Sequence, residues 1–407
     1  MSNEENPKTT NAHAGSPPAG LATKVVPPTS AEQQQQESAH QVVFADRTSQ
    51  GYLLLVKGKE PPTTPTRKQL VNLVKASFIG KLDDEEVQLL IGLIQTEPHR
   101  TDYLPQTTGL SAAGPTPAED DVITARERAR RSDLLGLHIE VMGVGAGESA
   151  LISDAAFDDP VLVRELTAEQ KVSLRSRRWA ILLRADYRNQ HAVRGLRLLQ
   201  TLVRIVAKDR KAMIFDPDTL ETLNEQAFTA RRLQTRLGNV ADQIAIVPFP
   251  DTRNGGDRIR LSSRGMRRFG AVDIELDGLA REPHALQRAT DFLYGLALVM
   301  IKNGEVDRSG FAVQVDAVIP VSFTDAQQAY GARSQSLTRC SHCPARSLVH
   351  LVERPAQPQD PADHVVARVV APRSTSDKAD YDHPAWVSRA LAQTFGGESP
   401  GTSATEP

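Results

Sequence analysis

The sequence has few cysteines, few aromatic residues and no long apolar run. Only two of its 407 residues are cysteine, and 5% are aromatic. Two cysteines exclude a framework of several disulfide bonds and are typical of a protein in the reducing cytoplasm. The longest apolar run, Leu296–Ile301, is much shorter than the roughly 20 residues that cross a membrane. The first residues also lack the basic and apolar segments of a secretory signal. We therefore expect a soluble, cytoplasmic protein without a membrane span.

The charge is nearly balanced, with 48 Lys and Arg residues against 50 Asp and Glu residues. A net charge of −2 excludes a chain-wide polycation, so nucleic acid would have to bind a local patch. Motifs of common catalysts are missing as well. The glycine-rich stretch 143–147 lacks the GxGxxG spacing, no Walker lysine follows it, and no GxSxG nucleophile motif occurs. We therefore name no catalytic residue and predict no cofactor.

Composition divides the chain into five segments. Residues 1–40 are rich in Pro, Ser, Thr, Asn and Gln, and residues 396–407 also lack apolar periodicity, so we expect two disordered tails. Between them we expect an N-terminal α+β unit at 41–165, a central α+β unit at 166–325 and a C-terminal extension at 326–395.

Hydrophobic periodicity predicts the elements of the N-terminal unit. Alternating apolar residues predict strands, and steps of three and four predict helices, the first capped by Thr66 and the second following Asp83. The expected elements are strands Gln41–Ala45 and Gly51–Val56, helix Arg67–Phe78, a helix with Val87, Leu90, Ile91 and Ile94 on one face, a loop at 97–121, and a hairpin of strands Leu137–Met142 and Ala150–Ser153.

The central unit contains the clearest strand, Trp179–Ala185, whose nearly continuous apolar run indicates an internal position in a sheet. A helix at about 190–208 follows it, with apolar residues at steps of three and four. The other expected elements are strand Ala212–Phe215, a helix capped by Asp218 or Thr219 that runs to about Arg236, strands Ile244–Phe249, Arg258–Ser262 and Val272–Leu276, helix Pro283–Lys302, strand residues within Phe311–Phe323 and His364–Val370, and helix Pro384–Phe395.

This order of elements is not a regular alternation of strands and helices. It favours an α+β fold in which helices pack on one side of a mixed or antiparallel sheet. The first half repeats part of the order of the second, so two related units remain an open interpretation.

One segment resembles a family of bacterial proteins of unknown function. Residues Arg264–Leu276 read RGMRRFGAVDIEL, and in that family a strand leads into TRGMRKFGLPDL and then a long helix. The upstream turn Asp216–Thr219 matches the D-x-x-T turn of the family, and Ala271-Val272 stands where the family has Leu-Pro. The resemblance covers about 125 of the 407 residues. It implies kinship with an α+β domain, and it implies no activity.

An arginine-rich turn in this segment is the first candidate binding site. Glycine allows positive φ and close approach to a ligand, and arginine side chains suit carboxylates or phosphates. The alternative, which we favour, is a tight connection with Met266 and Phe269 packed inward and the arginines paired with Asp273 or Glu275. The candidate residues are Arg264, Gly265, Arg267, Arg268 and Gly270.

A basic helix face is the second candidate. Its residues recur at steps of three and four along the helix 190–208, an arrangement that suits nucleic-acid phosphates or an acidic lipid surface. The alternative, which we favour, is a solvated face opposite the core. The candidate residues are Arg194, Arg197, Arg204 and Lys208.

Carboxylates near the expected strand ends are the third candidate. Asp186, Asp216 and Asp218 would suit Mg²⁺ binding or acid–base chemistry. Aspartate and proline are also what a turn between a strand and a helix requires, and we favour that explanation.

The two cysteines form a single CxxC, and they are the last candidate. Zinc could be held by Cys340 and Cys343 together with His350 and His364. A redox CxxC normally opens a helix, but Pro344 follows here. Because a second CxxC is missing, we favour a turn without metal.

These features favour a non-enzymatic binding or protein-interaction protein, with another protein as its partner. One alternative is an enzyme for a phosphate-bearing or acidic substrate, with the arginine turn as the binding site and the three aspartates for the chemistry. The other is a nucleic-acid-binding protein that uses the basic helix 190–208. The sequence predicts no oligomeric state.

Overall fold

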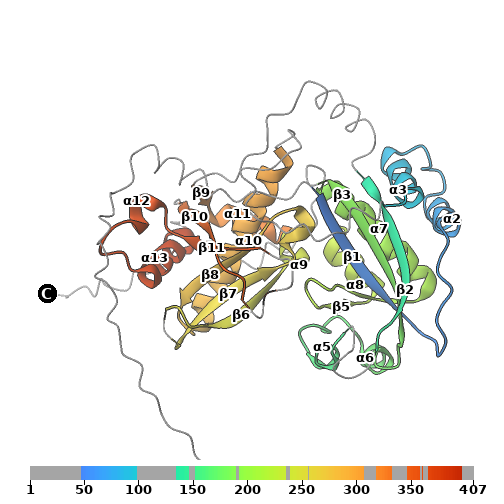
Figure 1. The fold of residues 1–407 in the computed structure, drawn as a ribbon, viewed down its shortest axis with the longest axis horizontal. Coiled ribbons are helices and arrows are strands. Elements are labelled where there is room, and N and C mark those ends of the chain that lie inside the picture. The colour runs from blue at the N-terminus through green and yellow to red at the C-terminus, as the bar shows by residue number, and fades with distance from the viewer. Residues whose placement is uncertain are drawn as a thin grey trace, which may run out of the picture. The chain divides into compact units, whose positions relative to one another are not determined.

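The computed structural model describes residues 47–98, 134–145, 152–188, 192–234, 239–254, 256–306, 318–331, 346–357, 360 and 365–396 (Figure 1). All of them belong to the unit formed by residues 40–407. The expected N-terminal tail, strand Gln41–Ala45, most of the loop 97–121 and all but the first residue of the C-terminal tail lie outside these ranges. None of the helices within these ranges combines the length and the apolar character of a membrane span.

The first sheet is antiparallel and has the strand order β2-β3-β1-β4-β5. Its strands are β1 (Arg47–Val56), β2 (Leu134–Gly143), β3 (Trp179–Arg188), β4 (Met213–Phe215) and β5 (Thr222–Leu223). The predicted strand Trp179–Ala185 lies within β3, between β2 and β1, which confirms its internal position. Alternation along β1 places Tyr52 and Leu54 on one face and Leu53 and Leu55 on the other, and all four side chains are buried.

Helices cover both faces of this sheet, and those in the described ranges are α2 (Arg67–Ser77), α3 (Glu85–Gln95), α5 (Asp154–Asp158), α6 (Ala168–Leu174), α7 (Ala192–Arg210) and α8 (Glu225–Arg232). The long helix α7 lies on the face of Tyr52 and Leu54, where α2 and α3 pack against it and α3 also contacts β2. The shorter α5 and α6 pack on the face of Leu53 and Leu55. The predicted helices α2, α3 and α7 are confirmed, with Thr66 as the N-cap of α2.

The expected hairpin at 137–153 is wrong. β2 pairs with β3, and Val141 lies opposite Ile181. Ser153 is not in a strand, because its hydroxyl accepts a hydrogen bond from the Ala156 N–H and caps α5. The ten-residue β3 offers β2 a longer ladder than a four-residue partner would.

The helix expected after Asp218 is also wrong. Leu220 adopts a φ of +59°, which turns the chain back so that Thr222 and Leu223 pair with β4 as β5. The helix α8 begins only after Asn224, whose side chain accepts from the Ala227 N–H. The carboxylates of the Asp216–Asp218 turn bind arginines instead, as described below.

The second sheet is mixed and has the strand order β6-β7-β8-β11-β10-β9. Its strands are β6 (Ala245–Asp251), β7 (Arg258–Arg264), β8 (Asp273–Leu279), β9 (Ile319–Val321), β10 (Ser347–Glu353) and β11 (Val366–Val370). Only β8 and β11 are parallel neighbours among these strands. One antiparallel and one mixed sheet, each with packed helices, confirm the predicted α+β class. The expectation that helices pack on one side is wrong for the first sheet, because α7 packs on one of its faces and α5 and α6 pack on the other. The strand β10 was not predicted.

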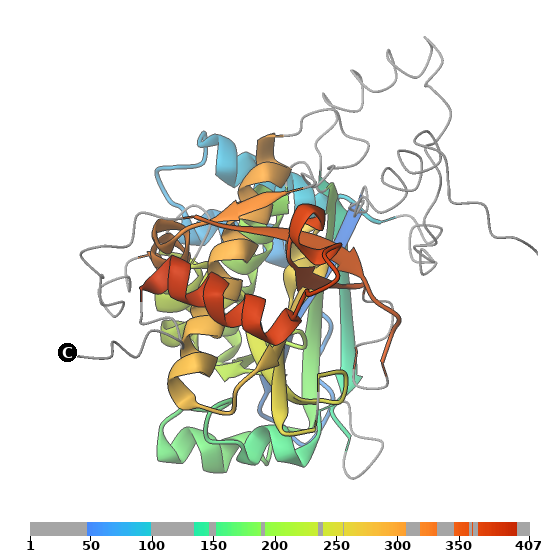
Figure 2. The same cartoon turned by 90° about the vertical axis from the view of Figure 1, so that its left-hand side faces the viewer.

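The helices of this half are α9 (Val240–Gln243), the 3₁₀ turn η4 (Met266–Phe269), α10 (Pro283–Val306), α11 (Phe323–Ala329), α12 (Arg373–Ser376) and α13 (His383–Phe395). The predicted helices α10 and α13 pack against β8 and against each other (Figure 2). The helix α11 was not predicted. It packs on α10 at Gly295, where a Cβ atom would lie 2.8 Å from the Ala326 backbone nitrogen.

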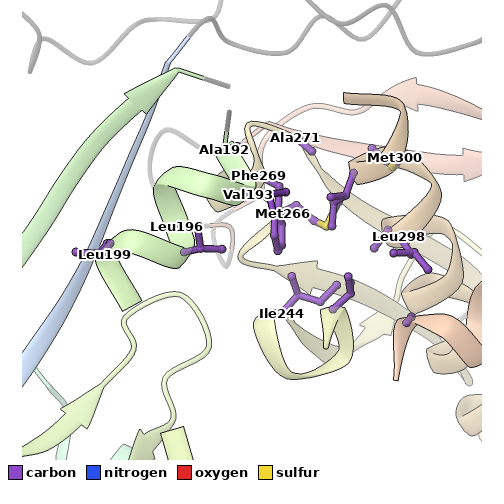
Figure 3. Close-up of a cluster of buried hydrophobic side chains, with 14 of the residues drawn as sticks. Ala192, Val193, Leu196, Leu199, Ile244, Met266, Phe269, Ala271, Leu298 and Met300 are labelled. Atoms are coloured by element: carbon purple, nitrogen blue, oxygen red, sulfur yellow. The ribbon is translucent and has the colours of Figure 1, made fainter. Parts of the chain in front are cut away.

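The sheets divide the chain differently from the predicted units 41–165 and 166–325. Strand β1 pairs with β3 across the first limit, and β8 pairs with β11 across the second. Apolar side chains of α7, including Val193 and Leu196, gather near Met266 and Phe269 of η4 and Met300 of α10 (Figure 3). This cluster brings the arginine turn next to the first sheet.

Candidate functional site

The arginine turn is a tight connection around η4. Gly265 and Gly270 flank it with φ angles of 103° and 72°, in the left-handed region that favours glycine. Met266 and Phe269 are buried, and the Met266 N–H donates to Asp273. Arg264 lies 3.3 Å from an Asp360 oxygen. The turn therefore directs its arginines toward carboxylates of the same chain.

The structure brings this turn together with the acidic turn. Arg268 has no exposure to solvent, and its Nη2 donates to both Asp216 oxygens at 2.9 and 3.0 Å and to Asp218 at 3.1 Å. Arg232 reaches Asp216 at 2.9 Å. Arg267 forms an ion pair with Asp218. We call Asp216, Asp218, Arg232 and Arg268 the charge junction.

Neighbouring polar groups complete the junction. The Tyr52 hydroxyl oxygen lies 3.4 Å from Arg268 Nη1. The same oxygen accepts a hydrogen bond from the Gln200 side-chain amide at 2.8 Å. Glu221 pairs with Arg231 and with Arg232. Asp216, Asp218 and Glu221 each form an ion pair with an arginine of the same chain. The negative charges of the cluster are therefore neutralised without a ligand. Asp216 and Asp218 are buried and saturated, so they offer no free carboxylate for catalysis at the arginine turn.

The third predicted aspartate lies elsewhere. Asp186 is buried on β3, opposite Ser49 of β1, and is not among the hydrogen-bond partners of Arg268.

Two arginines control the ionisation of Asp216. Burial alone would raise the pKa of this carboxyl group, but Arg268 and Arg232 outweigh burial and lower the pKa from 3.8 to about 2. Asp216 in turn holds the pKa of the buried Arg268 well above its ordinary value. Both groups are therefore charged in the folded protein.

Replacement of Arg268 should test the structural role of the junction. Arg268→Met leaves buried carboxylates without this partner, so we expect a loss of about 3–5 kcal/mol in the free energy of unfolding. Arg267→Met is the matched control. Its side chain is 43% exposed, and we expect a loss below about 1 kcal/mol. Urea unfolding measures both, and equal losses would contradict the assignment.

The junction also predicts acid sensitivity. A pKa lowered in the folded state stabilises the protein above the unfolded value of 3.8, and this contribution disappears as the pH falls toward 2. We expect a loss of about 2 kcal/mol over this interval. Urea unfolding between pH 5 and 2 should show a steeper decline for the natural protein than for Asp216→Asn. Parallel declines would disprove the assignment.

The predicted basic helix face is not a continuous exposed stripe. Arg194 and Lys208 are exposed, but Arg197 and Arg204 are half-buried. Arg197 lies 3.9 Å from Glu86 of α3. Of the four residues, Lys208 is the one that lines the pocket described next.

The zinc candidates are mostly outside the described residues. This applies to Cys340, Cys343 and His364, whereas His350 lies half-buried on β10. Within the described ranges, no group of three or more His, Cys, Asp or Glu residues could hold a metal ion.

A cavity of about 440 Å³ opens at one end of the first sheet. The antiparallel register places the end of β1 beside the start of β3, and it places Leu55 opposite Met213 of β4. Residues of α6, the end of α7 and the beginning of α8 complete the wall. We call this cavity the cationic pocket, after its four basic lining residues Lys57, Arg177, Lys208 and Lys211.

Arg177 is buried beside this pocket without a carboxylate. Its exposure is 5%, and its Nη1 donates to the carbonyl oxygen of Leu55 and to that of Lys211 at 3.4 Å. Its Nε has no hydrogen-bond partner, as is also true of Arg232 and Arg268, so the missing carboxylate is what distinguishes Arg177. Burial lowers the pKa of Arg177, and no acidic group raises it. A buried guanidinium without an anion is unfavourable, so this side chain lacks a partner that its chemistry requires.

The carboxylates of the pocket do not neutralise its cations. Glu169 accepts a hydrogen bond from Thr167 at 2.8 Å, and Glu225 accepts one from Thr229 at 3.2 Å. No ion pair among the described residues joins either carboxylate to the four basic side chains. Four cations and two carboxylates leave a formal charge of +2 on the lining.

Sequence reasoning assigned none of Lys57, Arg177 and Lys211 to a binding site, although Lys211 lies near the end of the predicted basic helix. Each stands next to an apolar element, just after β1, just before β3 and between α7 and β4. The basic residues beside the predicted strands were the available signal. Only the antiparallel register of β1, β3 and β4 brings those positions to one end of the sheet.

Comparison of the chain with protein-family models, curated proteins and solved structures gave no match. The kinship of the Arg264–Leu276 segment therefore stays a prediction.

Proposed function

We propose that this protein is a non-enzymatic binding protein for a small anionic ligand, which it holds in the cationic pocket. The observation that carries the proposal is the state of Arg177. Seven arginines of the described chain are buried, and the other six each lie within ion-pair distance of a carboxylate: Arg231, Arg232, Arg260, Arg264, Arg268 and Arg354. Arg177 is the exception, and it is the one that lines this cavity.

The three lysines support the same conclusion. Lys57, Lys208 and Lys211 are exposed and form no ion pair with the described residues. Positive charges around a concave surface raise the local concentration of anions and favour their capture. A bound anion would also offset the unfavourable burial of Arg177. A phosphate-bearing or acidic substrate was one alternative that the sequence left open, but that alternative placed the ligand at the arginine turn and not at these lysines.

The proposal is less compatible with a nucleic-acid ligand. The predicted basic face of α7 is interrupted by half-buried arginines, and Lys208 alone joins the other pocket cations. We therefore propose a small anion, in place of nucleic acid or another protein, as the primary ligand.

Charge reversal of the lysines should abolish anion binding. Inorganic phosphate near ten times its dissociation constant should raise the melting temperature by about 2–4 °C relative to NaCl of equal ionic strength. We expect Lys57→Glu and Lys208→Glu to lose this shift. Lys75→Glu is the control, because Lys75 is exposed in the last turn of α2 and does not line the pocket. The proposal fails if phosphate has no effect, or if all three variants respond like the natural protein.

Lys211 should show opposite effects on stability and binding. This residue follows α7 with a φ of +49°, a left-handed conformation that costs a side chain about 1–2 kcal/mol. Lys211→Gly removes that cost, so we expect an increase of about 1 kcal/mol in the free energy of unfolding. It also removes a pocket cation, so phosphate affinity should fall severalfold. Urea unfolding and calorimetry measure the two effects, and a stabilised variant with unchanged affinity would exclude Lys211 from the site.

A further inference from the structure

We infer that the ligand of the cationic pocket is a phosphate monoester of a hydroxyl-rich molecule, such as a sugar or polyol phosphate. The inference rests on the proposed function, and it adds the chemical class of the uncharged part of the ligand. It follows from the second wall of the pocket, from the absence of aromatic residues in the lining and from the charge.

The second wall of the pocket consists of uncharged polar side chains, some of whose hydrogen-bonding groups have no partner among the described residues. We call Gln170, Ser173 and Gln226 the polar wall. The Ser173 hydroxyl is buried and has no hydrogen-bond partner. A buried polar atom left unpaired costs about 1–3 kcal/mol, so a ligand that supplies its partner is favoured.

Gln170 is held in place to donate. Its Oε1 accepts from the Thr167 N–H at 3.0 Å and from Asn224 Nδ2 at 3.3 Å. These two bonds fix the side-chain amide and leave its NH₂ group without a partner among the described residues. A donor fixed before binding loses little entropy when a ligand oxygen arrives. Hydroxyl groups both accept and donate, so they match a wall of amide and hydroxyl groups.

The polar wall and the buried cation line the same cavity. Gln170 and Ser173 lie three residues apart on α6, Arg177 follows this helix before β3, and Gln226 lies in α8. One molecule can therefore contact a cation and hydroxyl-binding groups at the same time.

The lining argues against a nucleotide. Its apolar members are Ala207, Ala212 and Met213, and no aromatic ring occurs among the lining residues, all of which are described. Nucleobases are commonly held by stacking on aromatic side chains, which contribute about 1–3 kcal/mol per base. The pocket offers no such platform.

The charge favours a phosphate monoester over a carboxylate. The lining has a formal charge of +2, and a phosphate monoester carries about −1.5 to −2 at pH 7. A single carboxylate would leave one positive charge uncompensated. A nucleoside triphosphate would exceed the available positive charge.

Calorimetry with four probes tests the inference on the full-length protein. The probes are glucose 6-phosphate, inorganic phosphate, glucose and adenosine monophosphate. We expect glucose 6-phosphate to bind at least about tenfold more tightly than phosphate, because two or three additional hydrogen bonds form. Glucose should give no signal, and adenosine monophosphate should bind no more tightly than phosphate.

Two sets of variants separate the two walls. The double variant Ser173→Ala/Gln226→Ala should weaken glucose 6-phosphate about five- to tenfold and leave inorganic phosphate unchanged. Lys208→Glu should weaken both ligands. Ser173 makes no side-chain hydrogen bond and Gln226 is exposed, so the double variant should fold normally, which its melting temperature would verify.

The outcomes distinguish this inference from the proposed function. Equal affinity for phosphate and glucose 6-phosphate would overturn the inference and leave anion binding intact. Tighter binding of adenosine monophosphate than of either would overturn it as well. If no phosphate compound binds, both the inference and the proposed function are wrong.

Discussion

Arg268 brings a full positive charge into a place without access to solvent, and Asp216 meets it there with both carboxylate oxygens. A lone buried charge costs several kcal/mol, so each partner is tolerated only because the other is present. Arg268 belongs to the turn after β7, and Asp216 follows β4 of the first sheet. Their contact therefore fixes the η4 turn against the end of β4, and the apolar cluster of Val193, Met266 and Phe269 closes around it. The two halves of the described fold meet at this contact, because β4 belongs to the first sheet and β7, which precedes the η4 turn, belongs to the second.

The charge junction and the cationic pocket show two uses of the same chemistry within one chain. In the junction, the chain supplies a carboxylate for its buried arginines, and the result is a closed, neutral contact that stabilises the fold. At the pocket, the chain supplies only backbone carbonyls to Arg177, and its two nearby carboxylates bind threonines instead. The difference separates a structural arginine from the arginine that we propose binds a ligand. Exposure alone would not make this distinction, because both Arg177 and Arg268 are buried.

The sequence predicted those elements whose signal is local. The apolar run of β3 and the helical periodicity of α7 and α10 arise from neighbouring residues, and these elements form where expected. The turn at Asp216–Thr219 shows where local reasoning fails, since aspartate followed by threonine suits a helix cap as well as it suits a set of arginine partners. Which role applies is decided by Arg268, about 50 residues away. The pocket is less predictable still, because Lys57, Arg177 and Lys211 become neighbours only through strand pairing. The sequence alone shows that these residues are basic, but it does not show that they lie together around one cavity.

The buried charge of Arg177 is tolerated without a carboxylate because backbone carbonyl groups compensate part of that charge. The carbonyl oxygens of Leu55 and Lys211 accept its N–H groups, and the carbonyl end of α7 places a partial negative charge nearby. Such dipoles position a guanidinium but do not cancel its charge. A carboxylate at the same place would do so, and it would turn the pocket into a second closed junction with no room for an anion. The left-handed backbone at Lys211 supports this view, because a glycine there would be more stable but would carry no charge. Both features reduce stability in the same small region, and both add positive charge to the same cavity, which is the pattern expected where a site depends on a ligand to complete it.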